Sequence, residues 1–483
     1  MFSWRQVFGI GILAFASCSI TNAPVNKLLT SDNDTAQYDS DAQYVGDDEL
    51  YIGLAFSGGG TRASAFSYGV LKALQAATKD DKNPDGLLPS VRLVSGVSGG
   101  SVTAAYFGLR GAKGLATYRE DFLIQNAEKY MANSILNPLT LVRGLTGGAN
   151  GRKTFARFLD ESLFHKATFA DLAKHGYATT WLNASDVANN TPFLFSPETF
   201  DALCSDLASL PISEAVSASA AFPLVFSPIV LKAHGTSCDY TEPDWLTAAR
   251  FNPEATSAMR AYGETLESYR DPEKVKYVKL LDGGITDNFG TTSLSVARAK
   301  AQNEYGPLSA KDAVKLKRML FLVSNAGVQT DFKWTQKIRG PGGMQLAMSI
   351  ANSAMGSATR VGYDVLRLSL DRWVDDLVAF RCGLSRSKVQ QLRGTLKGWD
   401  CKDLKMFIGE ISFAALDKDT RKQLNQIPTR LRLKTDEVDL VIQAGINAAN
   451  SNPELNGFLR SLEGYKPEKP TGRIKPRRIS SSN

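Results

Sequence analysis

The chain has 483 residues, 43% of them hydrophobic, which is enough for one large domain or for two to three smaller ones. The net charge is +7, and the segment Lys466 to Arg478 carries +5 of it, from six basic residues and one acidic residue. The rest of the chain is therefore nearly neutral, and we expect no nucleic-acid partner. Histidine, cysteine and acidic residues show no metal-site spacing, and we predict no metal and no cofactor.

Residues 1–17 have the features of a secretory signal peptide. Arg5 precedes an apolar run, Val7 to Phe15, which is too short to span a bilayer. Ala14-Phe15-Ala16 fits cleavage after residue 16, whereas the residues up to Cys18 resemble a bacterial lipobox, with phenylalanine in place of the usual leucine. We favour lipidation of Cys18, and hence an exported cell-envelope protein on a membrane anchor. A periplasmic or secreted protein, or a buried N-terminal segment, is the alternative.

Two segments are expected to lack a fold of their own. Residues 18–48 include an acidic stretch without lysine or arginine, which predicts a flexible tether. Residues 466–483 combine basic residues with prolines, which predicts a disordered tail. The tail either keeps the protein soluble or binds an anionic membrane surface.

The first motif follows a predicted buried strand, Tyr51 to Phe56, and precedes a helix with apolar residues at helical spacing. Between them lie Gly58, Gly59 and Gly60, whose N–H groups suit an oxyanion hole or a phosphate cradle. The phosphate cradle is the weaker interpretation, because no Gly-Lys-Ser/Thr sequence follows. Arg62 either binds an anionic head group, braces the loop, or is an ordinary surface arginine.

The second motif places Ser98 between a predicted strand, Val91 to Val94, and a helix that begins near Val102. This is the pattern of a nucleophile elbow, a strained turn at the carboxyl end of a strand. We expect Gly96 and Gly100 to be required because a Cβ atom at either position would crowd the other.

The middle of the chain is predicted to be helical over residues 112–175, and a hairpin is expected over residues 179–185 and 191–196. Residues 235–275 are read as an insertion that forms a lid. Within a mainly helical extension, residues 328–465, the most apolar helix is Met344 to Met355. We prefer a core helix there to a membrane-docking one.

The third motif is Asp282-Gly283-Gly284, at the end of a predicted strand, Val278 to Leu281. An aspartate at this position suits a base that reaches a nucleophile, although Asp-Gly is also a common turn. A last core strand is predicted over residues 317–324.

Four cysteines besides Cys18 are available for two disulfides in an oxidising compartment. Nearness in sequence suggests Cys204 with Cys238 and Cys382 with Cys401, but three pairings are possible.

Together the three motifs, and a helix entering a proline turn over Ala215 to Pro223, resemble the patatin-like phospholipase family from Glu49 to Gly327. The resemblance implies a three-layer α/β/α sandwich over residues 49–327. It also implies a phospholipase A or lysophospholipase activity on acyl-ester lipids by a Ser98–Asp282 dyad, without histidine and without calcium.

Two other interpretations stay open. A Ser-His-Asp esterase would have to use Ser98, Asp186 and His234, because all three histidines precede Asp282 whereas the usual order places histidine last. His165 and His175 are expected to be surface or packing residues. The second alternative is a non-catalytic lipid-binding or scaffold protein on the same fold.

Overall fold

The computed structural model describes residues 22–30, 47–131, 150–253, 255–328, 333–336, 338, 340, 342–462 and 465. The expected signal segment, most of the expected tether and the basic tail lie outside these ranges. The described part of the tether is paired, not free: β1 (Lys27–Leu28) lies antiparallel to β6 (Ser205–Asp206). The Asn26 side chain reinforces the pairing, because its Nδ2 donates to the Ser205 Oγ at 2.6 Å.

An eight-stranded mixed sheet forms the centre of the molecule, in the order β10-β9-β2-β3-β4-β8-β7, with β5 paired to β4. Neighbours from β10 to β4 are parallel, whereas β8 is antiparallel to both β4 and β7. The predicted hairpin is confirmed, since β5 is antiparallel to β4. The strand bounds are β2 (Leu50–Phe56), β3 (Val91–Val97), β4 (Thr179–Asp186), β5 (Thr191–Leu194), β7 (Ile229–Lys232), β8 (Tyr277–Asp282), β9 (Arg318–Asn325) and β10 (Lys405–Ser412).

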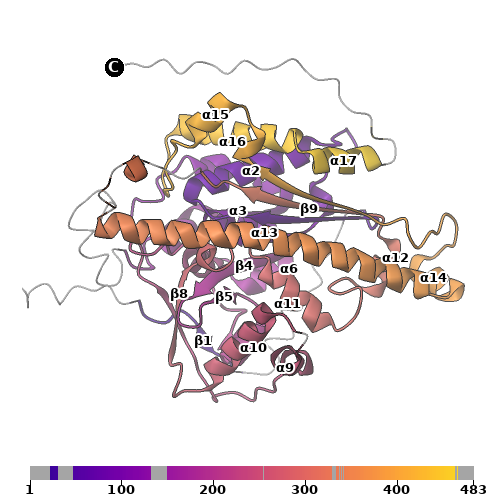
Figure 1. Cartoon of the computed structure of the whole chain (residues 1–483), viewed down its shortest axis with the longest axis horizontal. Coiled ribbons are helices and arrows are strands. Elements are labelled where there is room, and N and C mark those ends of the chain that lie inside the picture. The colour runs from indigo at the N-terminus through magenta and orange to yellow at the C-terminus, as the bar shows by residue number, and fades with distance from the viewer. Residues whose placement is uncertain are drawn as a thin grey trace, which may run out of the picture.

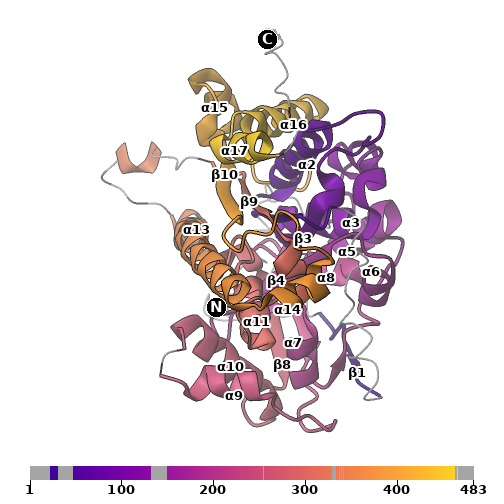
Figure 2. The ribbon, with the colours of Figure 1, turned by 90° about the vertical axis from the view of Figure 1, so that its right-hand side faces the viewer.

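Helices cover both faces of this sheet, so the predicted three-layer sandwich is confirmed (Figures 1 and 2). Alternate residues of β2 show why: Ile52 belongs to one hydrophobic cluster and Tyr51 to the other. On the first face lie α2 (Gly60–Ala76), α3 (Gly99–Gly114), α16 (Thr435–Asn450) and α17 (Pro453–Ser461). On the second face lie α11 (Thr292–Ala301), α12 (Ala310–Lys315) and α13 (Gly343–Gly383).

The C-terminal extension is part of the same core. It is mainly helical, as predicted, but it also supplies β10, an edge strand that the sequence analysis missed. α16 packs closely along α2. A Cβ atom on Gly445 would overlap the Phe66 carbonyl oxygen and lie 3.1 Å from the Gly69 Cα. Because Gly445 has no side chain, the backbones of α2 and α16 can approach closely.

The insertion is folded as α9 (Asp244–Phe251) and α10 (Ser257–Arg270). These helices pack on each other, on β5, on α11 and on α7 (Pro197–Ala202). Tyr262 and Tyr269 of α10 are buried. α13 packs beside the Asp282 motif, and the lid over residues 235–275 stays a prediction.

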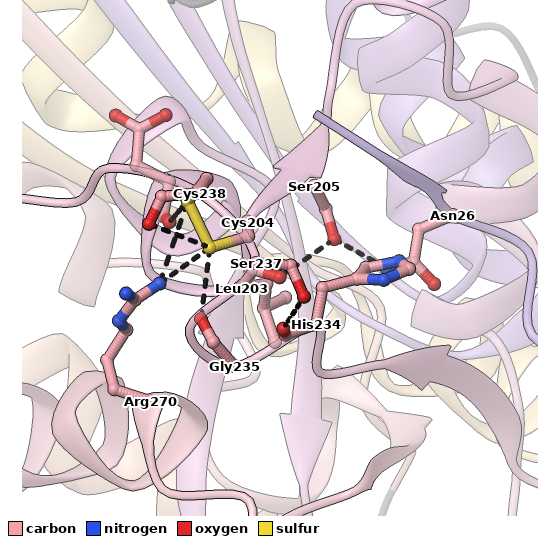
Figure 3. The surroundings of a disulfide bond; sticks show 10 residues. Asn26, Leu203, Cys204, Ser205, His234, Gly235, Ser237, Cys238 and Arg270 are labelled. Atoms are coloured by element: carbon pink, nitrogen blue, oxygen red, sulfur yellow. Dashed lines mark hydrogen bonds between the residues drawn. A yellow bond between two sulfur atoms is a disulfide. The ribbon is translucent and has the colours of Figure 1, made fainter. Parts of the chain in front are cut away.

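Both disulfides suggested by nearness in sequence are present. Cys204 and Cys238 have Cα atoms 5.5 Å apart, and Arg270 Nη1 lies 2.6 Å from the Cys204 sulfur (Figure 3). Cys382 and Cys401, with Cα atoms 5.0 Å apart, tie the end of α13 to the loop before β10. The first bridge ties the turn between α7 and β6 to the loop after β7, and the second encloses α14 (Arg386–Arg393).

Candidate active site

Ser98 lies in the turn between β3 and α3, with φ 53° and ψ −124°. A positive φ is unusual for a serine, because its Cβ atom crowds the backbone. This is the strained geometry that a nucleophile elbow requires. The side chain is almost buried, since 7% of the residue is exposed.

The two glycines of the elbow are needed for different reasons. A Cβ atom on Gly96 would lie 2.6 Å from the Ser101 Cα and 2.7 Å from the Gly100 carbonyl oxygen, which confirms the predicted crowding. A Cβ atom on Gly100 would instead meet the Ser57 carbonyl oxygen at 2.6 Å. Gly100 therefore also lets the elbow pack against the end of β2 and the start of the glycine-rich loop.

The glycine-rich loop lies against the serine, because a Cβ atom on Gly58 would be 3.1 Å from the Ser98 Cβ. Its three glycines differ in their hydrogen bonds. The Gly58 N–H donates to the Asn288 Oδ1 at 3.0 Å. Gly59 and Gly60 have positive φ angles, 141° and 62°, and their N–H groups donate to no residue within the described ranges. The Gly58 N–H is therefore already occupied, whereas the N–H groups of Gly59 and Gly60 are available to hold an oxyanion.

Arg62 braces this loop and does not face solvent. It is 2% exposed and donates from Nη1 to the Ile427 carbonyl at 2.6 Å, from Nε to the Ala326 carbonyl at 3.2 Å, and from Nη2 to Thr429 at 3.0 Å. Burial lowers the pKa of the guanidinium to about 10. Of the three interpretations of Arg62, the bracing role is the one that this geometry supports.

Asp282 ends β8 and is 2% exposed. Burial raises the pKa of its carboxyl group to about 6, an effect that hydrogen bonds from the Ser98 side chain and the Gly284 N–H, at 2.9 Å, partly offset. Gly283 allows the strand end to approach β4 closely, because a Cβ atom there would lie 2.5 Å from the Asn183 carbonyl oxygen. Sequence positions 98 and 282 thus meet at one edge of the sheet.

Three polar residues around the site were missed from the sequence. Ser219 accepts a hydrogen bond from the Ser98 N–H at 2.8 Å. Asn183 donates to the Gly96 carbonyl at 3.3 Å, and Asn288 holds Gly58. Ser219 lies within the helix and proline turn over residues 215–223, and Asn288 lies six residues after Asp282. Their nearness in sequence to a motif was the signal that the sequence offered for them.

The alternative triad is not assembled. His234 lies two residues beyond Lys232, which pairs with Tyr277 at the end of β8 opposite to Asp282. Five residues of strand, about 17 Å, separate these two ends. Asp186 accepts from the Tyr269 hydroxyl at 2.8 Å, and His165 and His175 are exposed, as expected.

α13 crosses the front of the molecule and covers the site from the second face of the sheet (Figure 1). The Met355 sulfur lies 3.2 Å from where a Cβ atom on Gly284 would be, and the Thr359 hydroxyl accepts from Asn288 Nδ2 at 2.8 Å. The segment Met344 to Met355 was expected to be a core helix, but Leu346 and Ile350 are exposed. No side chain that the structure describes in this segment is buried, so that expectation was wrong.

A cavity of about 410 Å³ lies away from the site. It is lined by residues at the start of β4, such as Thr179 and Trp181, whereas Ser98 follows the carboxyl end of β3. Among the described residues no group of three or more histidine, cysteine or acidic side chains is placed to hold a metal ion. None of the described helices is both long and apolar enough to cross a membrane.

Comparison with known protein families gives one match. The model of the patatin-like phospholipases matches residues 54–295, which contain Ser98, Asp282 and the glycine-rich loop. No curated protein matches the chain.

Solved structures similar to the chain include human GIVD cytosolic phospholipase A2, at 12% identity and a TM-score of 0.38, over 89% of this chain and 67% of that one. The same human enzyme in complex with methyl gamma-linolenyl fluorophosphonate matches at 13% identity and a TM-score of 0.35, over 88% and 64%. The chain thus spans about two thirds of the length of these structures.

Proposed function

This chain belongs to the patatin-like phospholipase family, whose members are serine hydrolases of lipid esters, and we propose that it cleaves carboxylic esters of membrane lipids through a Ser98–Asp282 dyad. The observation that carries the proposal is the meeting of a strained, nearly buried serine with a buried carboxyl group from a distant strand. No histidine of the described structure takes part.

In the first step the Ser98 Oγ attacks the ester carbonyl carbon while Asp282 takes the hydroxyl proton. An ordinary aspartate is too weak a base for this role, since its pKa is about 3.9. Burial brings the pKa of Asp282 to about 6, close to the range in which a general base works near neutral pH. The protonated Asp282 then supplies the proton that the leaving alcohol needs, and a water molecule activated by Asp282 hydrolyses the acyl-serine.

The negative charge that develops on the carbonyl oxygen needs hydrogen-bond donors. We assign this role to the N–H groups of Gly59 and Gly60, because the Gly58 N–H is already held by Asn288. Gly60 is the first residue of α2, so the positive end of that helix dipole adds to the stabilisation. One such donor contributes about 3–4 kcal/mol to transition-state binding.

A panel of esters tests the chemistry. The release of fatty acid from phospholipids, lysophospholipids and a short p-nitrophenyl ester is compared between the wild type, Ser98→Ala, Asp282→Asn and the control His234→Ala. We expect at least a thousandfold loss of activity for the first two variants, because a nucleophile or base is removed, and a normal rate for His234→Ala. Activity that survives in Ser98→Ala would refute the dyad.

A fluorophosphonate label separates the enzyme from the non-catalytic alternative. A protein that binds lipids without catalysis would hydrolyse none of the esters and leave Ser98 unlabelled, whereas the dyad predicts labelling at Ser98 alone. The panel also identifies the head group and chain length of the substrate, because each lipid is measured separately.

We further propose that the protein is exported and anchored in the cell envelope by lipid on Cys18. The support is the sequence alone: an apolar run after Arg5 and a small-residue approach to the cysteine. Mass spectrometry of the mature N-terminus distinguishes the possibilities, since a diacylated Cys18 supports the anchor and cleavage after residue 16 refutes it.

A further inference from the structure

α13 carries apolar side chains on two opposite faces. Leu366, Leu370, Trp373 and Leu377 are 5% exposed or less and pack into the core on the second face of the sheet. At about 100° per residue, these positions fall on one side of the helix. The exposed apolar residues fall on the other side. We call them the apolar stripe: Leu346, Ile350, Val361, Val365 and Leu368, which are 48–70% exposed.

The stripe is long and lies in a stretch with few charges. From Leu346 to Leu368 the helix rises about 33 Å. Residues Gly343 to Thr359 contain no charged side chain at all. A helix face in contact with water normally carries charged residues. A large exposed apolar face instead marks a surface that binds a partner. Figure 2 shows α13 nearly end-on at the margin of the molecule, with one side away from the sheet.

The opposite face of the same helix touches residues that neighbour the catalytic pair. Met355 lies against Gly284, and Thr359 accepts from Asn288, which in turn holds Gly58. A surface that docks on the stripe therefore lies one helix diameter, about 10–12 Å, from the catalytic edge of the sheet.

We propose that the apolar stripe is the surface by which the protein docks on a lipid layer that contains its substrate. This rests on the proposed function, because the lipid layer is the source of the ester. The stripe is about 33 Å long and about 10 Å wide, roughly 330 Å², which is well below the ~800 Å² that each partner buries in a stable protein dimer. The stretch around Leu346 and Ile350, residues 343–359, carries no charge, which likewise fits a hydrocarbon layer better than a second protein surface with a polar rim, whereas Arg360, Asp364 and Arg367 lie among the other stripe residues.

Binding to phosphatidylcholine vesicles tests the docking. The full chain carries Ser98→Ala, so that the vesicles are not hydrolysed, and Cys18→Ser, so that no lipid anchor contributes. Into this parent we introduce Ile350→Gln, Val361→Gln and Leu368→Gln. The vesicles have no net charge, so the basic tail is not attracted to them. We expect the partition of the stripe variant into vesicles to fall at least tenfold.

The matched control replaces three exposed apolar residues on other elements, Val187→Gln, Phe251→Gln and Tyr277→Gln, which are 36–70% exposed in the folded chain. Its partition should equal that of the parent. With Ser98 intact, the stripe variant should lose hydrolysis of vesicle lipid but keep its rate on a water-soluble short ester within twofold, which also shows that it is folded.

Two results would overturn the proposal. One is equal vesicle binding by the parent and the stripe variant. The other is a parent that is a dimer in light scattering and a stripe variant that is a monomer, which would make a second copy the partner. If the wild type hydrolyses no ester and the vesicle result is still as expected, the proposed function fails and the docking surface stands.

Discussion

Asn288 links the glycine-rich loop to α13: its Oδ1 accepts from the Gly58 N–H at 3.0 Å, and its Nδ2 donates to the Thr359 Oγ1 at 2.8 Å. The Thr359 hydroxyl in turn donates to the Met355 carbonyl at 2.7 Å. One amide side chain therefore fixes both the backbone beside the serine and the helix above it. Asn288 is a positioning residue, because it acts on the reaction through Gly58.

Removing the hydroxyl that orients this amide should slow catalysis. We expect Thr359→Val to lower kcat on a short ester about tenfold, which corresponds to about 1.4 kcal/mol, with KM changed less than twofold. Thr359→Ser keeps the hydroxyl and should retain most of the rate. Steady-state kinetics on the three proteins checks this, and a Thr359→Val enzyme as fast as the wild type would show that Asn288 needs no support from α13.

The pKa of Asp282 predicts an acid limb in the rate profile. Since the unprotonated carboxylate is the base, kcat/KM should rise with pH and reach half its plateau near pH 6, because burial raises the pKa to about 6. The pH dependence of short-ester hydrolysis measures it. A midpoint near pH 4 would mean that Asp282 behaves as an ordinary exposed aspartate in the free enzyme.

The same group makes a separate prediction for stability. A carboxyl group whose folded pKa is higher than its unfolded pKa loses stability as pH rises between the two values, here from the reference 3.8 to about 6. Asp282→Asn does not titrate, so its free energy of unfolding should increase relative to the wild type across this range and stay level above it. Urea unfolding at pH 4 and pH 7 gives the comparison, and a constant difference between the two proteins would contradict the assignment.

The contact between α2 and α16 should tolerate no side chain at Gly445. Because an added Cβ would overlap the Phe66 carbonyl, Gly445→Ala should destabilise the protein by about 1–3 kcal/mol, as overpacking does. Gly356→Ala on α13 is the control, since an added Cβ there meets only Arg360 at 3.7 Å. Alanine is the better helix former, so this control should be neutral or slightly stabilising. Thermal unfolding of both variants decides the point.

The Cys382–Cys401 bridge closes a loop with a sequence separation of 19 residues. Chain-entropy reasoning gives such a bridge about 3 kcal/mol, so the double variant Cys382→Ala and Cys401→Ala should lose that much in urea unfolding. Dithiothreitol should destabilise the wild type and affect the double variant only through Cys204–Cys238. No difference between the variant and the wild type would indicate that the bridge is absent in solution.

The motifs were predictable because each couples a strand end to a turn that few residue types allow. Ser98 in the turn after β3 and Asp282 at the end of β8 follow from local patterns, but their meeting depends on the antiparallel pairing of β8 with β4, which local patterns do not show. The edge strand β10 was missed because buried and exposed side chains alternate only weakly along it. Before residue 411, Ile408 is its only large side chain that is buried. The pattern of α13 was detected, but periodicity alone does not distinguish a covered apolar face from an exposed one.

The polar residues around the site were harder to foresee. Ser219 acts through one hydrogen bond and Asn288 through two, all of which depend on tertiary structure, and neither residue lies in a pattern specific to its role. Arg62 was weighed as a head-group ligand because arginine is usually exposed, whereas here a segment from the far end of the chain, Ile427 and Thr429, surrounds it.

The family match and the folding unit have different boundaries. The match ends at residue 295, yet β2 lies between β3 and β9, and β9 begins at Arg318. A fragment that ended with the match would leave one side of β2 unpaired, with a row of open amide and carbonyl groups on a hydrophobic strand, and would also remove the carbonyls that hold Arg62. We expect such a fragment to aggregate, so the smallest piece of this chain worth expressing extends through α17.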